Sequence, residues 1–165
     1  MMDQRLHTEL LVLLPCSVHF AKSIALYMDE LRARSPVKIP DAWPSDRVKM
    51  FLPFYLEAKE AGDDTPFFWV IISLEDVEII GEVILKPRRQ KRELELSYQI
   101  ESTHRLQGYG FEAVNAVCEW ARGSDLKKIV AETALGNIAS ERLLQRVGLV
   151  EQGIEHEFKQ WELVK

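Results

Sequence analysis

The sequence predicts one domain of mixed α and β structure, in which a central sheet is covered by helices on both faces. The chain has 165 residues, the size of a single domain with a buried core. Three consecutive segments in the middle of the chain have the residue pattern of strands, and helix-like segments stand before and after them. Because the sequence contains no internal repeat and no low-complexity linker, we expect residues 1–165 to form one domain.

The N-terminal part predicts a strand followed by two helices. Residues 8–14 are apolar and predict a short strand. Ser17 is a suitable N-cap for a helix that extends to about Arg34, and Asp46 is a suitable cap for a second helix. Pro53 lies inside the second helical segment and predicts a kink or a division into two short helices.

Three antiparallel strands are expected next. Residues 67–74 are rich in β-branched and aromatic side chains, and residues 77–85 follow after a short polar turn, so these segments predict a hairpin. Residues 93–101 alternate between apolar and polar side chains, which predicts a strand with one buried face. The basic run at residues 88–92 is interpreted as the solvated loop before that strand.

The C-terminal part predicts two further helices and three further strands. A helix from about residue 108 to 122 carries its apolar residues on one face. Asn137 is suited to cap a second helix, which Gly148 ends. The expected strands cover residues 128–133, 149–153 and 156–164. The element order is therefore β-α-α-β-β-β-α-β-α-β-β, with about seven strands in a mixed and mostly antiparallel sheet.

The composition excludes several classes of protein. Hydrophobic residues make up 47% of the chain and charged residues 28%, which is typical of a globular domain. The net charge of −5 disfavours nucleic-acid binding, because contacts to phosphates need a basic face. The N-terminus lacks the apolar core of a signal peptide, and no apolar run approaches the roughly 20 residues of a membrane span. We therefore expect a soluble, cytoplasmic protein that binds neither nucleic acid nor membrane.

The two cysteines do not predict a metal site or a disulfide framework. Cys16 and Cys118 are far apart in the sequence and lie in apolar helical patterns, so we expect buried free thiols. The sequence contains no Cys-x-x-Cys motif and no Cys/His cluster, and we expect no metal.

The segment that carries chemistry joins the strand at residues 93–101 to the helix that begins near Gly108. The first backbone N–H groups of a helix lack intrahelical partners and carry a partial positive charge, which suits a phosphate. Gly108 and Gly110 remove side chains where a ligand approaches the backbone, and Arg105 adds a cation. The alternative is that the two glycines only allow a tight turn between strand and helix.

This segment and two others resemble a known family. Residues 105–110, Arg-Leu-Gln-Gly-Tyr-Gly, resemble the Gln/Arg-x-x-Gly-x-Gly/Ala signature of the GNAT superfamily of acetyltransferases. Residues 137–149 are similar to the second acetyl-CoA segment of that family, which begins Asn-x-x-Ser. Residues 7–13 resemble the opening of the RimJ/RimL branch, which contains acetyltransferases of ribosomal-protein N-termini.

The sequence departs from the pattern of that branch at three positions. Leu106 stands where the branch commonly has glycine, Leu149 replaces a phenylalanine, and Leu10 replaces an arginine. The third difference weakens the assignment to ribosomal-protein enzymes more than it weakens the assignment to the family.

The resemblance implies an acetyl-CoA-dependent N-acetyltransferase with a GNAT-like fold. A primary amine, either a protein N-terminus or a small amine, would attack the thioester directly. The cofactor would lie where the strand at residues 98–101 separates from residues 129–132. Asn137 would reach the pantetheine arm, or it is only a helix cap. The implied acetyl-CoA contacts are Gln99, Ile100, Glu101, Arg105, Leu106, Gln107, Gly108, Tyr109, Gly110, Phe111, Asn137 and Ser140.

The catalytic residues implied by the resemblance are less specific. Glu95 or Glu82 would accept the proton of the amine, although each could instead be a salt-bridge partner or an exposed strand residue. Ser140 would donate a hydrogen bond to the departing thiolate. Many family members use a tyrosine after the Asn segment as the acid, and no tyrosine follows Tyr109 in this sequence. We expect His104 to be a surface or packing residue.

The acceptor amine is not specified by the sequence. An aromatic stretch that includes Trp43, Phe51, Phe54 and Tyr55 either lines an acceptor pocket or covers the sheet, and we expect Phe51 and Phe54 in the core. The alternatives are a GNAT-fold module that binds acetyl-CoA with little or no catalysis, and a structural domain without a cofactor. Family members are monomers or homodimers, and we expect the same here.

Overall fold

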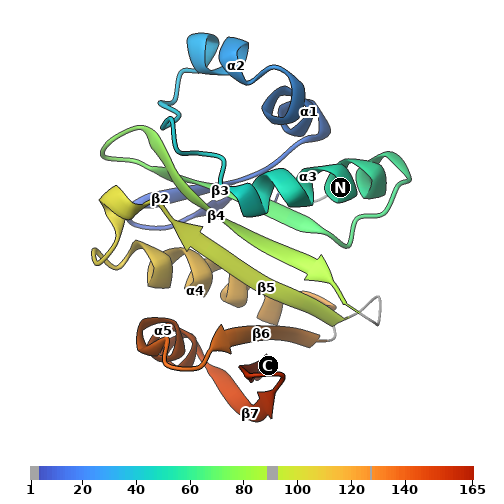
Figure 1. Cartoon of the computed structure of the whole chain (residues 1–165), viewed down its shortest axis with the longest axis vertical. Coiled ribbons are helices and arrows are strands. Elements are labelled where there is room, and N and C mark those ends of the chain that lie inside the picture. Colours follow the sequence, from blue (N-terminus) through green and yellow to red (C-terminus); the bar gives the residue numbers. More distant parts are fainter. Residues whose placement is uncertain (1–3, 89–92, 127) are drawn as a thin grey trace.

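An eight-stranded sheet forms the centre of the computed structural model, which describes residues 4–88, 93–126 and 128–165. The strands follow the order β1-β2-β3-β4-β5-β6-β8-β7, and of the described neighbours only β5 and β6 are parallel (Figure 1). The strands are β1 Leu6–His7, β2 Leu11–Pro15, β3 Phe67–Ser73, β4 Glu78–Pro87, β5 Glu93–Ile100, β6 Lys128–Ala134, β7 Leu149–Glu155 and β8 Phe158–Leu163.

Helices cover both faces of the sheet, as Figure 1 shows. Helices α1 to α3 pack on one face, and α4 and α5 pack on the other. A single 3-10 turn, η1, leads from β5 into α4. Within the described ranges no helix is long and apolar enough to cross a membrane. The helices are α1 Val18–Leu26, α2 Met28–Arg34, α3 Asp46–Glu60, η1 Ser102–His104, α4 Tyr109–Arg122 and α5 Ile138–Val147.

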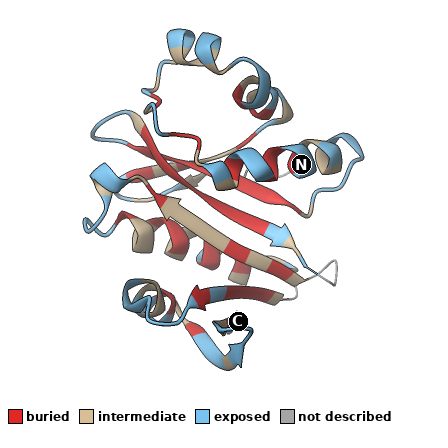
Figure 2. Ribbon diagram, in the orientation of Figure 1, coloured by how far each residue is buried: buried red, intermediate tan, exposed pale blue. Residues whose placement is uncertain are grey.

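Strand β3 contributes to both hydrophobic cores, because successive side chains of a strand point to opposite faces. All of its residues are buried. The odd-numbered residues of 67–71 pack in the cluster beneath α4, and the even-numbered residues of 68–72 pack in the cluster beneath α1 and α3. Figure 2 shows the buried residues concentrated along these central strands. The sheet is therefore buried most completely at β3 and β4, whereas β7 at its edge is mostly exposed.

The strand predicted at residues 8–14 corresponds to β2, and the short strand β1 before it was not predicted, which gives eight strands instead of about seven. The chain turns between β1 and β2 because Thr8 takes over hydrogen bonds that a continuous strand would make. The backbone N–H of Leu11 donates to Thr8 Oγ1 at 3.0 Å, and the N–H of Thr8 donates to the carbonyl of Leu11 at 3.0 Å.

The helix predicted from Ser17 to about Arg34 is divided into α1 and α2 in the structure. Ser17 caps α1 as expected, since its Oγ accepts the N–H of Phe20 at 3.1 Å. Tyr27 then leaves the helical region, with φ −135° and ψ 44°, and separates α1 from α2.

Helix α3 is continuous through Pro53, so the expected division was wrong. A proline inside a helix removes one N–H, and Lys49, whose carbonyl would have accepted it, is exposed to water. The cap of this helix is Ser45 rather than Asp46, because Ser45 Oγ accepts the N–H of Val48 at 3.4 Å.

The parallel pairing of β5 with β6 is short. Glu93, Leu94 and Glu95 stand opposite residues 128–130, and the ladder ends there. Strand β5 continues to Ile100 beside β4 alone. The two strands therefore separate beyond Glu95, and the groups of β5 that face β6 are left without a sheet partner.

Gly81 lies at a close approach of β4 and β5. It stands opposite Ile100 in the antiparallel ladder, one position from the pair Glu82 and Gln99. A Cβ atom built on Gly81 would lie 2.0 Å from the carbonyl oxygen of Gln99, a distance that non-bonded atoms do not adopt. Only glycine fits here, and the close approach fixes Gln99 at the point where β5 has left β6.

We expect Gly81→Ala to lower the free energy of unfolding by about 1–3 kcal/mol, because the added methyl forces the backbone of Gln99 to move. Urea unfolding measures this change. Gly123→Ala is the matched control, since Gly123 has φ −84° and an added Cβ would make only ordinary contacts, the nearest at 3.6 Å. Equal stabilities of the two variants would contradict the close contact.

Candidate active site

A pocket of about 690 Å³ opens where β5 and β6 separate. Its walls come from β5, the loop before α4, the end of β6 and the first turns of α5. The separation was expected between residues 98–101 and 129–132. The structure shifts it, because residues 129 and 130 still pair with β5, and the open part lies between residues 96–100 and 131–134.

The loop at residues 105–110 presents the start of α4 to this pocket. Gly108 is the N-cap of α4, with φ 84° and no side-chain cap. The first N–H groups of α4 therefore point toward the pocket without intrahelical acceptors. Arg105 is held at the end of β5, since its Nε–H donates to the carbonyl of Ile100 at 2.9 Å. This arrangement places a fixed cation beside the positive end of a helix.

Two glycines make this loop possible for different reasons. A Cβ on Gly108 would meet nothing within 4 Å, so glycine is favoured there by the positive φ. A Cβ on Gly110 would lie 3.2 Å from Leu143 of α5 and 3.6 Å from the ring of Tyr98, so glycine allows α4, α5 and β5 to meet. Leu106 also has a positive φ of 64°, and its side chain is fully exposed.

The pocket fits a pyrophosphate that continues into an extended chain. The donors at its mouth are backbone amides and guanidinium groups, since Arg105, Arg142 and Arg146 all line it. Further in, one edge of β5 lacks a strand partner and can pair with an extended ligand. The walls there are apolar, formed by side chains such as Leu96 and Leu144.

Most of the residues expected to contact the cofactor meet at this pocket. Glu101 and Gln107 do not line it: the N–H of Glu101 donates to the carbonyl of Ile80 at 2.7 Å, and the Gln107 side chain donates to the carbonyl of Thr103 at 3.4 Å. The expected residues that do line it are Gln99, Ile100, Arg105, Leu106, Gly108, Tyr109, Gly110, Phe111, Asn137 and Ser140.

Asn137 and Ser140 form the α5 wall of the pocket. Asn137 Oδ1 accepts the N–H of Ser140 at 3.2 Å, so the expected helix cap is confirmed. Ser140 Oγ lies 3.2 Å from the hydroxyl oxygen of Tyr98 on β5. Tyr98 was not singled out in the sequence as a site residue. It is partly buried, and its hydroxyl was the available signal, because a tyrosine hydroxyl inside a protein usually finds a hydrogen-bond partner.

Glu82 lies on the other face of the sheet, beneath α3, and is 1% exposed. Trp43 Nε1–H donates to Glu82 Oε1 at 3.0 Å, and Arg47 Nη2 lies 3.4 Å from Glu82 Oε2. The same Arg47 nitrogen lies 3.3 Å from Gln99 Oε1. Burial raises the pKa of the Glu82 carboxyl, the Trp43 hydrogen bond and Arg47 lower it, and the charge of Glu101 raises it.

Trp43 and Arg47 therefore define the surroundings of Glu82. Trp43 was expected either to line an acceptor pocket or to cover the sheet, and it is fully buried against the sheet. Of the two phenylalanines expected in the core, Phe51 is buried and Phe54 is 40% exposed.

Arg47 lines the pocket between β5 and β6 and was not singled out in the sequence. No sequence pattern marks it, because its importance comes from partners 35 and 52 residues away.

Glu95 lies at the closed end of the pocket. It stands opposite Val130 in the last pair of the β5–β6 ladder and opposite Lys86 on β4. Neither Glu95 nor Glu82 lines the pocket directly, whereas Ser140 does. The three expected catalytic residues are thus distributed over both faces of the sheet, and only Ser140 is at the pocket wall.

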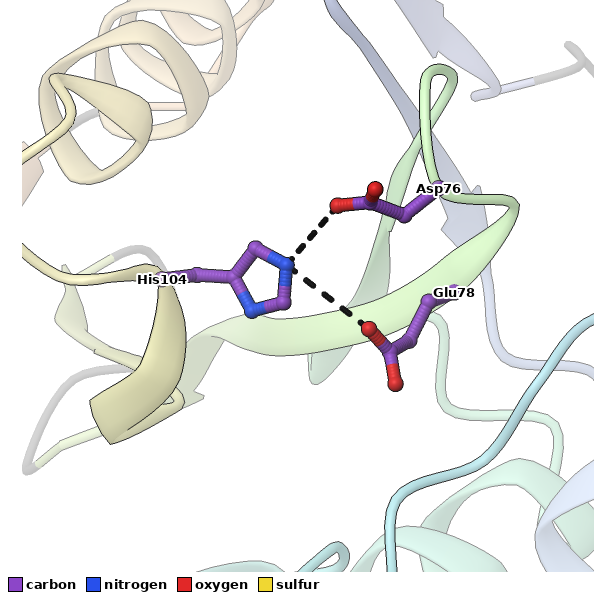
Figure 3. Close-up of side chains that lie close together, drawn as sticks. All are labelled: Asp76, Glu78 and His104. Carbon is purple, nitrogen blue, oxygen red and sulfur yellow. Dashed lines mark hydrogen bonds and ion pairs between the residues drawn. The ribbon is translucent and has the colours of Figure 1, made fainter.

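His104 links the loop before α4 to the turn between β3 and β4 (Figure 3). Its Nε2 lies 2.9 Å from Asp76 Oδ2 and 3.7 Å from Glu78 Oε1, and its Nδ1 lies 3.0 Å from Thr103 Oγ1. Lys38 also pairs with Glu78, at 3.5 Å. The packing role expected for His104 is therefore specific: it anchors η1, directly before Arg105.

Both cysteines are buried free thiols, as expected. Burial raises the pKa of Cys118 to about 12 and raises the pKa of Cys16 further still. Since the thiolate is the nucleophilic form of cysteine, neither thiol is prepared for covalent catalysis. The basic run expected as a solvated loop falls largely on residues 89–92, which lie outside the described residues.

Comparison with known proteins decides the family. The family profile described as "Acetyltransferase (GNAT) domain" matches residues 12–150, which include both walls of the pocket. The chain belongs to the GNAT acetyltransferase family. The resemblance drawn from residues 105–110 and 137–149 is confirmed, and the protein is an N-acetyltransferase of this family.

Individual GNAT relatives are distant in sequence but similar in fold. The uncharacterized N-acetyltransferase YjdG of Bacillus subtilis (strain 168) is 24% identical over 123 residues, covering 72% of this chain and 73% of the relative. Ribosomal-protein-S5-alanine acetyltransferase from Vibrio fischeri superposes with a TM-score of 0.68 at 21% identity, covering 98% and 97% of the two chains. RimL, a ribosomal L7/L12 α-N-protein acetyltransferase solved in complex with coenzyme A, superposes with a TM-score of 0.67 at 13% identity, covering 98% of each chain.

The buried contact of Trp43 with Glu82 in this GNAT enzyme gives a pH-dependent prediction. Trp43→Phe removes a donor from a buried carboxylate, and we expect it to destabilise the fold at neutral pH by about 1–2 kcal/mol more than Trp161→Phe. Trp161 is the matched control, because it is equally buried and donates to the neutral Thr133 Oγ1 at 2.9 Å.

The difference between these two variants should shrink as the pH falls. Because the pKa of Glu82 is raised in the folded protein, protonation of this carboxyl stabilises the fold at low pH. This stabilisation is lost as the pH rises through the raised pKa. Below that pKa Glu82 is neutral, so the hydrogen bond lost in Trp43→Phe costs less free energy of unfolding. Thermal unfolding at several pH values measures the effect, and a difference that grows in acid would contradict it.

Proposed function

We propose that this GNAT enzyme transfers the acetyl group of acetyl-CoA to a primary amine, either a peptide N-terminus or a small amine, by direct attack. The observation that supports this most strongly is the separation of β5 from β6 beside the uncapped N-terminus of α4. The coenzyme A complex of the similar RimL structure supports the choice of acyl donor.

The donor's pyrophosphate would be held by the amides of residues 106–111 with Arg105 alongside. Its pantetheine arm would pair with the unpartnered edge of β5 near Gln99 to Glu101, and Asn137 would reach the same arm. When bound, acetyl-CoA supplies an activated acyl group as a thioester. A backbone N–H near Gln99 or Ile100 would polarise the acyl oxygen.

The reaction forms a C–N bond and breaks a C–S bond. The amine nitrogen gives up a proton, and the departing sulfur keeps the C–S electron pair and gains a proton. The amine must be neutral to attack, so a group on the acceptor side has to hold its proton. Residues 95, 97 and 99 of β5 face the α3 side of the sheet, together with Glu82, so the acceptor would approach from that side.

We assign the base to Glu82. Burial raises the pKa of the Glu82 carboxyl above its ordinary value, which makes its carboxylate a stronger proton acceptor. Arg47 contacts Glu82 and Gln99 and lines the pocket with Gln99, and the amine proton would reach Glu82 through water beside these side chains. Glu95 is the comparison, because it lies on the same face of the sheet at the closed end of the pocket.

Donor binding is tested by a pair of glycine variants. Acetyl-CoA at millimolar concentration should raise the melting temperature of the protein, and Gly108→Trp should abolish the shift. Gly62→Trp is a matched control, because Gly62 has φ 80° and an added Cβ would meet nothing within 4 Å, as at Gly108 with φ 84°. Both variants carry similar backbone strain, but only Gly108 lies at the pocket. A shift retained in Gly108→Trp would refute the assigned site.

Turnover is tested by thiol release with a panel of amines and short peptides. We expect Glu82→Gln to lower kcat/KM on the order of 10²-fold and to remove the acid limb of its pH profile, while Glu95→Gln keeps that limb. A loss of the limb in Glu95→Gln alone would move the base to Glu95. A thermal shift without thiol release for any amine would indicate a donor-binding module instead of an enzyme.

A further inference from the structure

A pair of hydroxyl groups spans the pocket between β5 and α5. The hydroxyl oxygen of Tyr98 lies 3.2 Å from Ser140 Oγ, and both residues line the pocket. They are 42 residues apart in sequence and belong to two different walls of the pocket, β5 and α5. Their contact therefore joins two walls of the pocket.

Both members of the pair are held in place. Ser140 stands in the first turn of α5, and its N–H donates to the Asn137 cap at 3.2 Å. The ring of Tyr98 lies against the first turn of α4, where an added Cβ on Gly110 would come within 3.6 Å of it. The hydroxyl of Tyr98 is directed across the pocket to α5 as a consequence.

The pair lies on the opposite face of β5 from the proposed base. Because side chains alternate along a strand, Tyr98 points toward α4 and α5, whereas Gln99 points toward Arg47 and Glu82. The reaction needs a proton acceptor at the amine and a proton donor at the sulfur. The two faces of this strand carry one group of each kind.

A serine alone is a poor source of that proton. A serine hydroxyl is a very weak acid, whereas a phenol titrates near pH 10 and a thiol near pH 8.5 in model compounds, so a phenol is much better matched to a thiolate. A phenol that donates to Ser140 Oγ leaves the serine O–H directed at a further acceptor. The sequence provides no tyrosine after Tyr109 for this purpose.

We propose that Tyr98 is a positioning residue for Ser140 and the source of the proton that the sulfur gains. This inference rests on the proposed function. As the C–S bond breaks, the sulfur takes the hydrogen of Ser140 Oγ, Ser140 takes the hydrogen of Tyr98, and solvent restores the proton of Tyr98. No oxidant, metal or covalent acyl-enzyme is involved in this step.

The experiment uses Tyr98→Phe, Ser140→Ala and Ser140→Thr, with Tyr27→Phe as the control. Phenylalanine keeps the ring of Tyr98, and threonine keeps the hydroxyl of Ser140. Tyr27 is exposed at the junction of α1 and α2, away from the pocket. Calorimetry compares the affinity of each variant for coenzyme A with its affinity for desulfo-coenzyme A, which lacks the sulfur.

Wild type, Ser140→Thr and Tyr27→Phe should prefer coenzyme A over the desulfo analogue by roughly tenfold, through a hydrogen bond to the sulfur. Tyr98→Phe and Ser140→Ala should lose this preference and still bind the analogue as wild type does. In turnover, both variants should lower kcat on the order of 10²-fold with little change in the KM for acetyl-CoA. The double variant should be no worse than either single one, because the two hydroxyls act as a unit.

An unchanged preference for the sulfur in Tyr98→Phe, together with an unchanged kcat, would overturn the inference. Wild-type binding and turnover would then still support the proposed function. Failure of wild type to bind either coenzyme would instead refute the proposed function itself. Weaker binding of both coenzymes by Tyr98→Phe would show that the tyrosine only supports the pocket wall, which also overturns the inference.

Discussion

The end of the β5–β6 ladder at Glu95 and Val130 is the constraint on which the rest of this structure depends. Parallel strands normally continue side by side, and here they separate after three residue pairs. The separation opens the edge of β5 that faces β6 and makes room for the pocket. It also lets the first turn of α5 contact β5, through Ser140 and Tyr98. Gly81 supports it from the other edge, because its missing side chain lets β4 hold the backbone of Gln99 closely.

The alternation of side chains along β5 then divides the site into two halves. Gln99 belongs to the polar group under α3, with Arg47 and the buried Glu82. Tyr98, the adjacent residue, belongs to the group formed with Ser140 under α5. One strand thus places a carboxylate network and a hydroxyl pair on opposite sides of the same opening. The pleat of the strand directs the adjacent side chains of Tyr98 and Gln99 to these two sides.

The sequence carried enough information for the order of elements from β3 onward and for the loop before α4. Strand alternation at residues 93–101 and the glycines at 108 and 110 are local patterns, and local patterns determine turns, caps and buried faces. The hydrogen bonds of Tyr98 and Glu82 could not be found in that way. Their partners are 42 and 39 residues distant, and the apolar pattern reports burial without naming a partner. The division of the first helix at Tyr27 was missed for a similar reason, because no glycine or proline marks it.

The anchoring of the α4 loop by His104 has a consequence for substitutions elsewhere in the chain. Asp76 lies in the turn between β3 and β4, and His104 Nε2 lies 2.9 Å from its Oδ2. His104 is the last residue of η1, directly before Arg105 and the loop that leads into α4. A substitution in the β3–β4 turn therefore reaches one wall of the pocket, although the two segments are 28 residues apart in the sequence.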